Sequence, residues 1–239
     1  MLEAGLWGLA GASTLVIGAA VGLLARVPRR TVGLVMAFGV GALISSLAFD
    51  LTEDAFEVGG TLPVAAGLGA GALVFYAGNR LLSQSRRGRT VAQANGNGPA
   101  IVLGALLDGI PESIVLGSTL LAGAGVSVPF LAAVAISNVP EALTAAVDLR
   151  REGHRPGWIL RLWIGVALVS GIAAAVGYGA LGEMGGSTWV PLIQAFAAGA
   201  ILTMLVDTMI PEAFADGGDL VGLATVLGFA AAFFLTKVG

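Results

Sequence analysis

The chain has 239 residues, of which 56% are hydrophobic and only 11% charged, with a formal net charge of −3 and a mean hydropathy of +0.92. This composition excludes an ordinary soluble domain and indicates an integral membrane protein. Cysteine is absent, which excludes disulfides, thiolate metal sites and a catalytic thiol. No basic segment precedes the first apolar stretch, so we expect the first span to be retained rather than cleaved as a signal peptide.

Apolar stretches close to the ~20 residues that a helix needs to cross a bilayer recur along the chain. Charge-free runs indicate six spans, and the long stretch from about Pro99 to Val147 is divided into two more by glycines and a proline. We predict one all-α transmembrane domain over residues 1–239, with eight spans at approximately 4–25, 31–52, 58–79, 100–122, 127–149, 158–182, 188–210 and 219–238.

The basic residues predict the orientation of these spans. Of the 12 Lys and Arg, all but Lys237 lie in the connections after the first, third and fifth spans. These connections should face the cytoplasm, which places both termini outside. The compact connections suggest the plasma membrane as the location.

Part of the chain repeats itself. Ala37–Gly60 aligns without gaps on Ala195–Gly218, sharing Ala-Phe at the start, Gly-Ala inside, and Ala-Phe and Gly-Gly at the end. These are the second and seventh spans, which run in opposite directions, so the match predicts an inverted repeat of spans one to three and six to eight. Such repeats are typical of secondary transporters, whose substrate sites lie near the midplane between the repeats. Spans four and five are then the central pair.

Both central spans carry a Pro-Glu pair inside an apolar run, "LLDGIPES" in the fourth and "AISNVPEA" in the fifth. Proline has no backbone N–H and clashes with the preceding turn, so we expect each proline to kink its helix. The carbonyls of Leu107 and Ile136, four residues before Pro111 and Pro140, should then be free to act as oxygen ligands.

The carboxylates of the central spans predict a cation site. Asp108 lies one turn before Glu112, and an ionised carboxylate costs roughly 2.5 kcal/mol or more to place in a membrane. No Lys or Arg lies in the core of either span, so pairing with arginine would need a residue from a span end, and protonation of the acids is the other alternative. A divalent cation meets the need most directly. We predict an oxygen-only metal site formed by Asp108, Glu112 and Glu141, with Asn138 assisting.

Further polar residues are candidates for the pathway of the cation. Ser137 lies one turn before Glu141. Asp50 and Asp54, in the acidic run "DLTEDAFE", would form either an outer mouth that attracts cations or simply a solvated loop. Asp207 and Glu212 flank Pro211 and are candidates for lining an inner exit.

The eight spans, the central "DGIPES" and "SNVPEA", and "DTMIPEAF" in the seventh span resemble the ZIP family of divalent metal transporters. The resemblance covers essentially the whole chain. It implies an eight-helix bundle in a 3+2+3 arrangement, uptake of zinc or a related metal toward the cytoplasm, and often a homodimer. It also implies an elevator-like motion in which spans one, four, five and six slide against the other four.

Carried over by motif position, Asp108, Gly109 and Glu112 stand where the family has its first-motif His, Asn and Glu, and Glu141 matches the second-motif Glu. The Asp in place of His marks this chain as an atypical member, and the sixth span has no acid inside it, which argues for one metal site rather than two. Zinc favours imidazole and thiolate ligands, whereas carboxylates and carbonyls suit harder metals. The cargo therefore stays open among Zn, Mn, Fe and Cd.

Two other functions use the same features. A proton-coupled cation exchanger would exploit the same acids, because crowding favours protonation of one of them. A non-transporting scaffold or sensor would need a closed, dry pair of central helices. An enzyme is not expected, because the spans contain no His, no Cys and no nucleophile motif. Neither a cofactor beyond the transported metal nor a nucleic-acid partner is expected.

Overall fold

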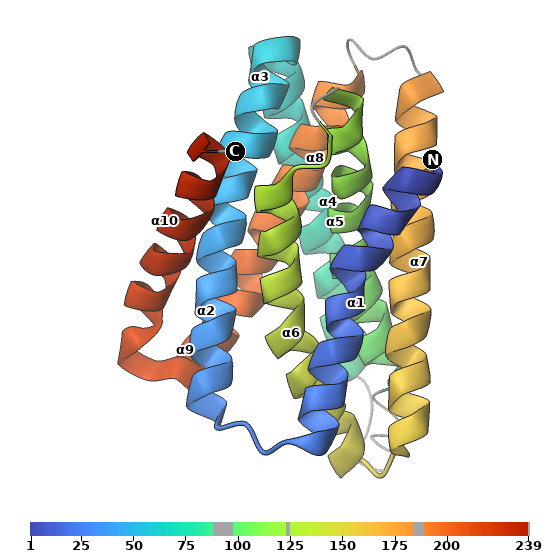
Figure 1. Ribbon diagram of the computed structural model, residues 1–239, viewed down its shortest axis with the longest axis vertical. Helices are drawn as coiled ribbons and strands as arrows, with labels where there is room; N and C mark the ends of the chain where they lie inside the picture. Colours follow the sequence, from blue (N-terminus) through green and yellow to red (C-terminus); the bar gives the residue numbers. More distant parts are fainter. Residues whose placement is uncertain (88–97, 123–124, 184–188, 239) are drawn as a thin grey trace.

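A computed structural model describes residues 1–87, 98–122, 125–183 and 189–238, and over these residues the chain is all-helical (Figure 1). Two π-helical segments, η1 (Leu47–Thr52) and η4 (Leu205–Met209), and two short 3₁₀ segments, η3 (Leu120–Ala122) and η5 (Gly218–Leu220), connect α-helices. The α-helices are α1 (Leu2–Leu24), α2 (Arg29–Ser46), α3 (Glu53–Gly59), α4 (Thr61–Arg87), α5 (Gly98–Thr119), α6 (Val128–Arg151), α7 (Pro156–Glu183), α8 (Trp189–Met204), α9 (Ile210–Gly217) and α10 (Val221–Val238).

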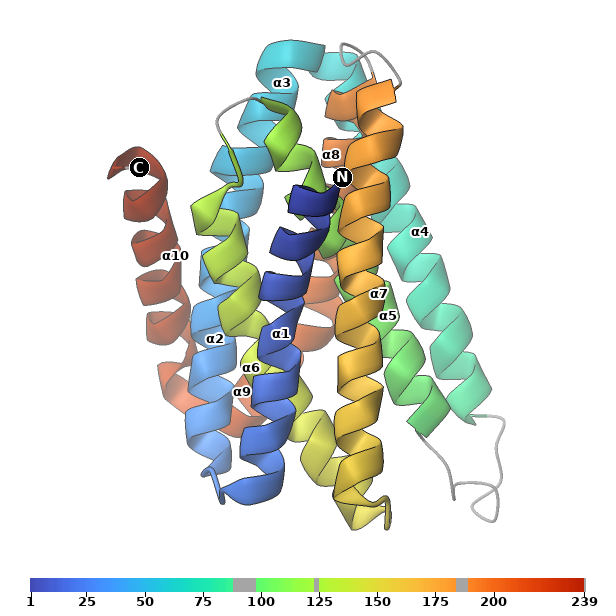
Figure 2. The ribbon, with the colours of Figure 1, turned by 45° about the vertical axis from the view of Figure 1, so that its right-hand side comes forward.

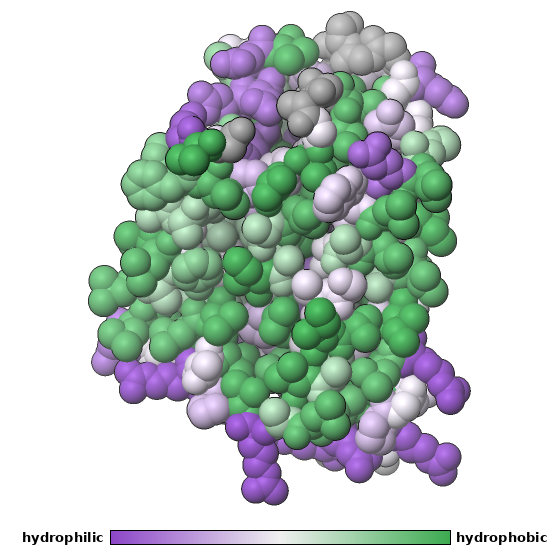
Figure 3. All heavy atoms as spheres, in the orientation of Figure 1, coloured by the Kyte–Doolittle hydropathy of each residue, from purple (hydrophilic) through white to green (hydrophobic). Residues whose placement is uncertain are grey.

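Several of these helices are long and apolar enough to cross a membrane. Among the described residues there are six such segments: Leu2–Leu24, Arg29–Gly59, Thr61–Leu81, Val128–Arg151, Pro156–Glu183 and Trp189–Val238. Hydrophobic side chains cover the middle of the visible face, and hydrophilic ones gather at its two ends (Figure 3). An apolar band of this kind is what a bilayer requires of the surface that contacts it. The membrane class and the all-α prediction are thus confirmed, whereas the count of eight spans stays a prediction.

The two ends of the bundle differ in what they contain. The connections from α1 to α2 and from α6 to α7 lie at the end where α9 also lies (Figure 1). The N-terminus, α3 and the last residues of α10 lie toward the opposite end. The basic residues of the two connections therefore share one end, and the prediction that this end faces the cytoplasm stays a prediction.

The second helix is longer than predicted. We expected a span over residues 31–52 followed by a new one at 58, but α2, η1 and α3 form one continuous rod to Gly59. The acidic run keeps its helical hydrogen bonds because a helix can continue past the apolar region into water. It ends at Gly60, whose φ of 70° lies in a region that residues with a Cβ rarely adopt.

The two segments that align in the sequence also share local geometry. In each, an α-helix widens into a π-helical segment, η1 in one and η4 in the other. Each segment ends at a glycine with positive φ, Gly60 at 70° and Gly218 at 68°, and these two glycines occupy the same position of the alignment. π-Helical turns are rare and usually occur singly, so a matched pair is informative.

Close helix crossings repeat in the same way. A Cβ added to Gly228 of α10 would overlap the carbonyl of Phe38 on α2, and a Cβ added to Gly71 of α4 would overlap that of Phe196 on α8. Phe38 and Phe196 are aligned positions of the two repeated segments. Glycine is needed at both crossings because the helix backbones touch directly, as is common between membrane helices.

The helices pack in a correspondingly regular way. α4 lies against α8 and α10 lies against α2, with α4 and α10 at opposite edges of the bundle (Figure 2). α1 packs on α6, α7 packs on α5, and α1 and α7 pack on each other. This leaves α5 and α6, the helices with the Pro-Glu pairs, flanked by other helices on most sides.

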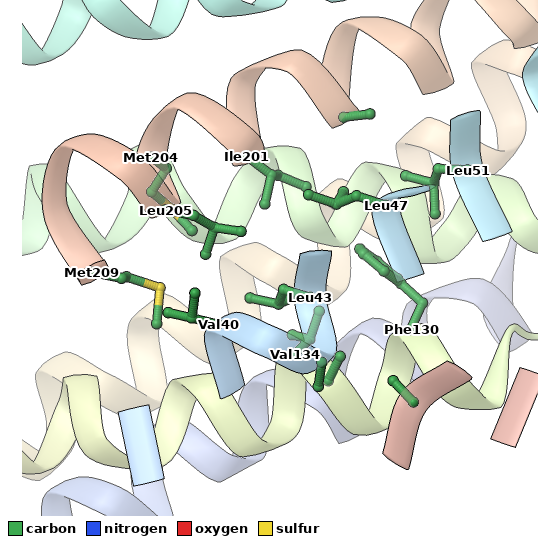
Figure 4. Close-up of a cluster of buried hydrophobic side chains, with 14 of the residues drawn as sticks. Val40, Leu43, Leu47, Leu51, Phe130, Val134, Ile201, Met204, Leu205 and Met209 are labelled. Atoms are coloured by element: carbon green, nitrogen blue, oxygen red, sulfur yellow. The ribbon is translucent and has the colours of Figure 1, made fainter. Parts of the chain in front are cut away.

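An apolar core fills the space between α2, α6 and α8. It is built mainly from aliphatic and methionine side chains, with the aromatic rings of Phe75 and Phe130 (Figure 4). Its labelled members are Val40, Leu43, Leu47, Leu51, Phe130, Val134, Ile201, Met204, Leu205 and Met209. Because lipid is as apolar as these side chains, tight packing rather than the hydrophobic effect holds such helices together.

Candidate functional site

The predicted ligands lie on the two central helices, where the structure places each in turn. Glu112 on α5 is buried, with 4% of its surface exposed, and Asn138 on α6 is buried to a similar degree. Asp108 and Glu141 are half-buried. Both helices continue through their prolines, so the Pro-Glu pairs lie within the helices rather than at their ends.

Glu112 and Asn138 share a small central cavity lined by α1, α5, α6 and α7. Its volume is about 10 Å³, which is close to the space that one water molecule needs. Ser170 of α7, 1% exposed, lines the same cavity. On the α1 side the wall contains Gly8 and Gly11, whose small size lets the helix approach. A carboxylate, an amide and a hydroxyl therefore line the same small cavity.

The amide of Asn138 is fixed by a neighbouring helix. Its Nδ2 atom donates a hydrogen bond of 3.3 Å to the carbonyl oxygen of Gly11 on α1. The bond occupies the nitrogen, which leaves the side-chain oxygen Oδ1 as the atom that can coordinate a cation.

The charged neighbours of the central carboxylates are themselves acidic. Glu141 lies close enough to feel the charges of Asp108, Glu112 and Glu212, and Glu112 feels that of Asp108. None of the ion pairs among the described residues involves the three central acids. Within that part of the chain, arginine pairing therefore does not explain why these carboxylates are buried.

The central acids are neighbours but are not gathered around one point. Over the described ranges, no three or more His, Cys, Asp or Glu side chains are close enough together to hold one metal ion. Ser137 is also turned elsewhere: its hydroxyl donates to the carbonyl of Val134, 2.9 Å away, and its backbone lies against Gly39 of α2. The central cavity thus joins Glu112 and Asn138, while Asp108 and Glu141 lie outside it.

A larger opening lies at the end of the bundle that contains α9, and we refer to it as the α9-end cavity. Its volume is about 310 Å³, and α2, α6 and α9 form its walls. Glu212 lines it, together with Thr144, which lies one turn after Glu141. Asp207 does not line it and is exposed on η4. Of the two acids near Pro211, only Glu212 lines this cavity.

Two ion pairs lie on the wall of the α9-end cavity. Arg29 Nη1 lies 3.7 Å from Asp216 Oδ1, and Arg151 Nη1 lies 3.2 Å from Asp148 Oδ1. Glu212 lies close enough to both of these acids to be repelled by them. A line of acids therefore leads from Glu141 through Glu212 to the opening.

A second large opening, the α3-end cavity, lies at the other end of the bundle. Its volume is about 450 Å³, and Asp54 and Glu57 line it beside Leu121 and Gln194. Asp54 thus lies at this opening, and its role as a cation-attracting mouth stays a prediction. Asp50 does not line this cavity; it lies half-buried on η1, facing other elements.

No protein-family model matches the chain, and no curated protein matches it. Function is therefore inferred from the side chains described above. Ser170 is a polar residue of the central cavity that was not predicted from the sequence, where only the absence of an acid was noted in the sixth span. A lone serine in "VALVSGIAAA" is a weak signal, since serine is common at contacts between membrane helices.

Proposed function

We propose that this protein is a secondary transporter that carries divalent metal cations across the membrane toward the cytoplasm, with Glu112 as the central ligand. One observation carries the proposal: Glu112 is 4% exposed, lines a small cavity together with Asn138, and has an acidic side chain as its charged neighbour. A carboxylate in such surroundings needs a cation or a proton to offset the cost of burial.

The proposal includes eight spans in an inverted 3+2+3 repeat. Its support is the sequence alignment, the paired π-helical segments η1 and η4, and the aligned glycines Gly60 and Gly218. The packing pattern adds to this, since α4 on α8 corresponds to α10 on α2, and α1 on α6 corresponds to α7 on α5. In this arrangement α5 and α6 are related by the same axis, which makes Glu112 and Glu141 counterparts.

The two large cavities suggest a route. The α9-end cavity reaches Thr144, which lies one helical turn from Glu141. On α5 and the segment after it, the α3-end cavity reaches only Leu121, which lies nine residues after Glu112. Nine helical residues correspond to about 13 Å. The apolar core of Figure 4 lies between α2, α6 and α8 and offers a cation no ligand there. We infer an inward-facing arrangement, in which the cation leaves past Glu212.

Metal binding would require a local rearrangement. Asp108 and Glu141 lie outside the central cavity, so their side chains would have to turn toward Glu112 as the cation arrives. In the empty protein, repulsion among the three acids opposes this movement. A divalent cation between them would make the net interaction attractive. The resulting ligands are all oxygen, which suits Mn and similar hard ions and leaves Zn, Fe and Cd to be tested. The resemblance to ZIP transporters, including their elevator motion and dimer, is part of the same proposal.

The deciding experiment is uptake by proteoliposomes of Zn, Mn, Fe(II), Cd, Co, Mg and Ca. We expect saturable uptake of at least one metal by the wild type, its loss in Glu112→Gln, and normal uptake by Glu183→Gln, which removes an exposed acid at the end of α7. Absence of uptake of every metal by folded wild-type protein would contradict the proposal. Flux that appears only with an imposed pH gradient would instead indicate the exchanger.

A further inference from the structure

Two acids line the α3-end cavity without a basic partner. They are Asp54 and Glu57, and the described part of the cavity wall contains no Lys or Arg. The two acids lie three positions apart on α3, so they share one face of the helix. Both are exposed to water, and within the described ranges neither belongs to an ion pair. Lys237 attracts Asp54 from outside the cavity, whereas Glu57 repels it.

A buried amide lines the same cavity. Gln194 of α8 is only 7% exposed, and its side chain forms no hydrogen bond within the part of the chain that the structure describes. An amide carries two N–H donors and one acceptor oxygen, and leaving such groups buried and unpaired is unfavourable. A partner that enters the cavity is therefore expected at Gln194.

Packing between α3 and α8 holds the acids and the amide on neighbouring walls. Ala55 and Ala195, which directly follow Asp54 and Gln194, are both completely buried and belong to one small apolar cluster. A Cβ added to Gly59, at the end of α3, would overlap the first turn of α8. The polar side chains are thus carried by two helices in direct contact, which preorganises the group.

The cavity has the size for an ion that keeps its water. Its volume is about 450 Å³. At about 30 Å³ for each water molecule, this is room for on the order of ten waters. Hard divalent cations such as Mg²⁺ give up water reluctantly and are often held by one or two carboxylates, with water as the remaining ligands. Two carboxylates and one amide oxygen beside a wet opening match that kind of binding.

The two end cavities correspond through the repeat but differ in charge. Three aligned pairs of residues line them: Asp54 with Glu212, Glu57 with Ala215, and Val58 with Asp216. The α9-end cavity also contains Arg29 and Arg151 beside its acids, whereas the described wall of the α3-end cavity contains no base. Since arginine weakens the binding of a cation, the α3 end is the better end for capture and the α9 end for release.

We propose that Asp54, Glu57 and the amide oxygen of Gln194 bind a hydrated divalent metal cation in the α3-end cavity. The two carboxylates balance its double charge, and the amide oxygen and water complete its surroundings. Binding here does not require transport, whereas a role as the capture step before Glu112 rests on the proposed function. The cation would then lose water on its way inward, because the central cavity of about 10 Å³ is too small for a hydrated ion.

The test is Mn²⁺ binding to the full chain in detergent, followed by the loss of the EPR signal of the free ion. The measurement is made in Glu112→Gln, which removes the central ligand and leaves the α3-end cavity intact. We expect this variant to bind Mn²⁺, and to bind it at least several-fold more weakly when Asp54→Asn or Glu57→Gln is added. Gln194→Met, which removes the polar atoms at similar size, should also weaken binding. Glu53→Gln is the matched control, because Glu53 is exposed on the same helix but does not line the cavity.

Undiminished binding after Asp54→Asn and Glu57→Gln would overturn the proposal, as would absence of Mn²⁺ binding by folded Glu112→Gln protein. An equal effect of Glu53→Gln would also overturn it, since it would show a general effect of surface charge. With Glu112 intact, Asp54→Asn should raise the KM for metal uptake at an unchanged maximal rate. The two proposals can fail separately: Mn²⁺ binding here without uptake contradicts only the transporter, and uptake without binding here contradicts only the capture site.

Discussion

The Nδ2 atom of Asn138 on α6 donates a hydrogen bond to the backbone carbonyl of Gly11 on α1, across 127 residues of sequence. The bond ties together two walls of the central cavity and orients the amide oxygen that we propose as a ligand. It also satisfies the donor of a buried amide.

Replacing Asn138 by alanine should therefore affect both stability and metal affinity. The carbonyl of Gly11 still accepts a hydrogen bond from Thr14 Oγ1, 2.6 Å away, so the loss should be that of an ordinary hydrogen bond, about 0.5–1.5 kcal/mol. We expect a lower unfolding temperature in detergent and a raised KM for metal uptake. Ser137→Ala is the matched control, because that hydroxyl bonds only within its own helix and the change should have a much smaller effect. Equal effects of the two variants would contradict the role given to Asn138.

The glycine crossings allow a test of the packing. Gly71→Ala places a Cβ against the Phe196 carbonyl, and Gly228→Ala places one against the Phe38 carbonyl. Forcing helices apart in this way typically costs about 1–3 kcal/mol, occasionally more. We expect both variants to unfold at a clearly lower temperature, and by similar amounts if the two crossings are counterparts.

Two other glycines on the same helices serve as controls. A Cβ at Gly69 of α4 or at Gly222 of α10 meets no atom within 4 Å. Alanine is the better helix former by about 1 kcal/mol, so Gly69→Ala and Gly222→Ala should be neutral or slightly stabilising. Destabilisation by these controls as large as that of Gly71→Ala would show that the crossings are not the cause.

Glu212 should govern the exit step. Glu212→Gln removes one acid from the α9-end cavity and weakens the attraction that draws a cation from Glu141 toward the opening. We expect a several-fold lower maximal rate of metal uptake with little change in stability, since Glu212 is exposed. Asp207→Asn, five residues earlier but outside the cavity, should transport normally. A similar loss of rate in both variants would indicate a general effect of charge.

The ion pair between Arg29 and Asp216 should affect transport but not stability. The Arg29 side chain is 69% exposed, and exposed pairs contribute only about 0–1 kcal/mol, so Arg29→Gln should barely change the unfolding temperature. It should nevertheless raise the maximal rate of metal uptake, because Asp216 is left unneutralised in the α9-end cavity and attracts the leaving cation. The shift should shrink at high ionic strength, and Arg155→Gln, which does not line the cavity, should show none.

Part of the architecture could be predicted from the sequence because it depends on local properties. Long apolar runs predicted membrane helices, and the observed helices follow them closely. The helix ends were less predictable: the acidic run after residue 52 stays helical to Gly59, since leaving the apolar region does not by itself end a helix. The aligned positions Gly60 and Gly218 end their segments because only glycine adopts their backbone conformation easily.

The assembly of the site was decided by the tertiary structure. The sequence placed Glu112 and Asn138 on their helix faces, but it did not show that Ser170 of α7 and Gly11 of α1 would complete the same cavity. Asp207 and Glu212 share one motif, yet the structure brings only one of them into an opening. The periodicity of a sequence indicates which residues share a face of one helix. Which of these faces meet depends on where small residues allow helices distant in the sequence to approach, and this is a property of the whole bundle.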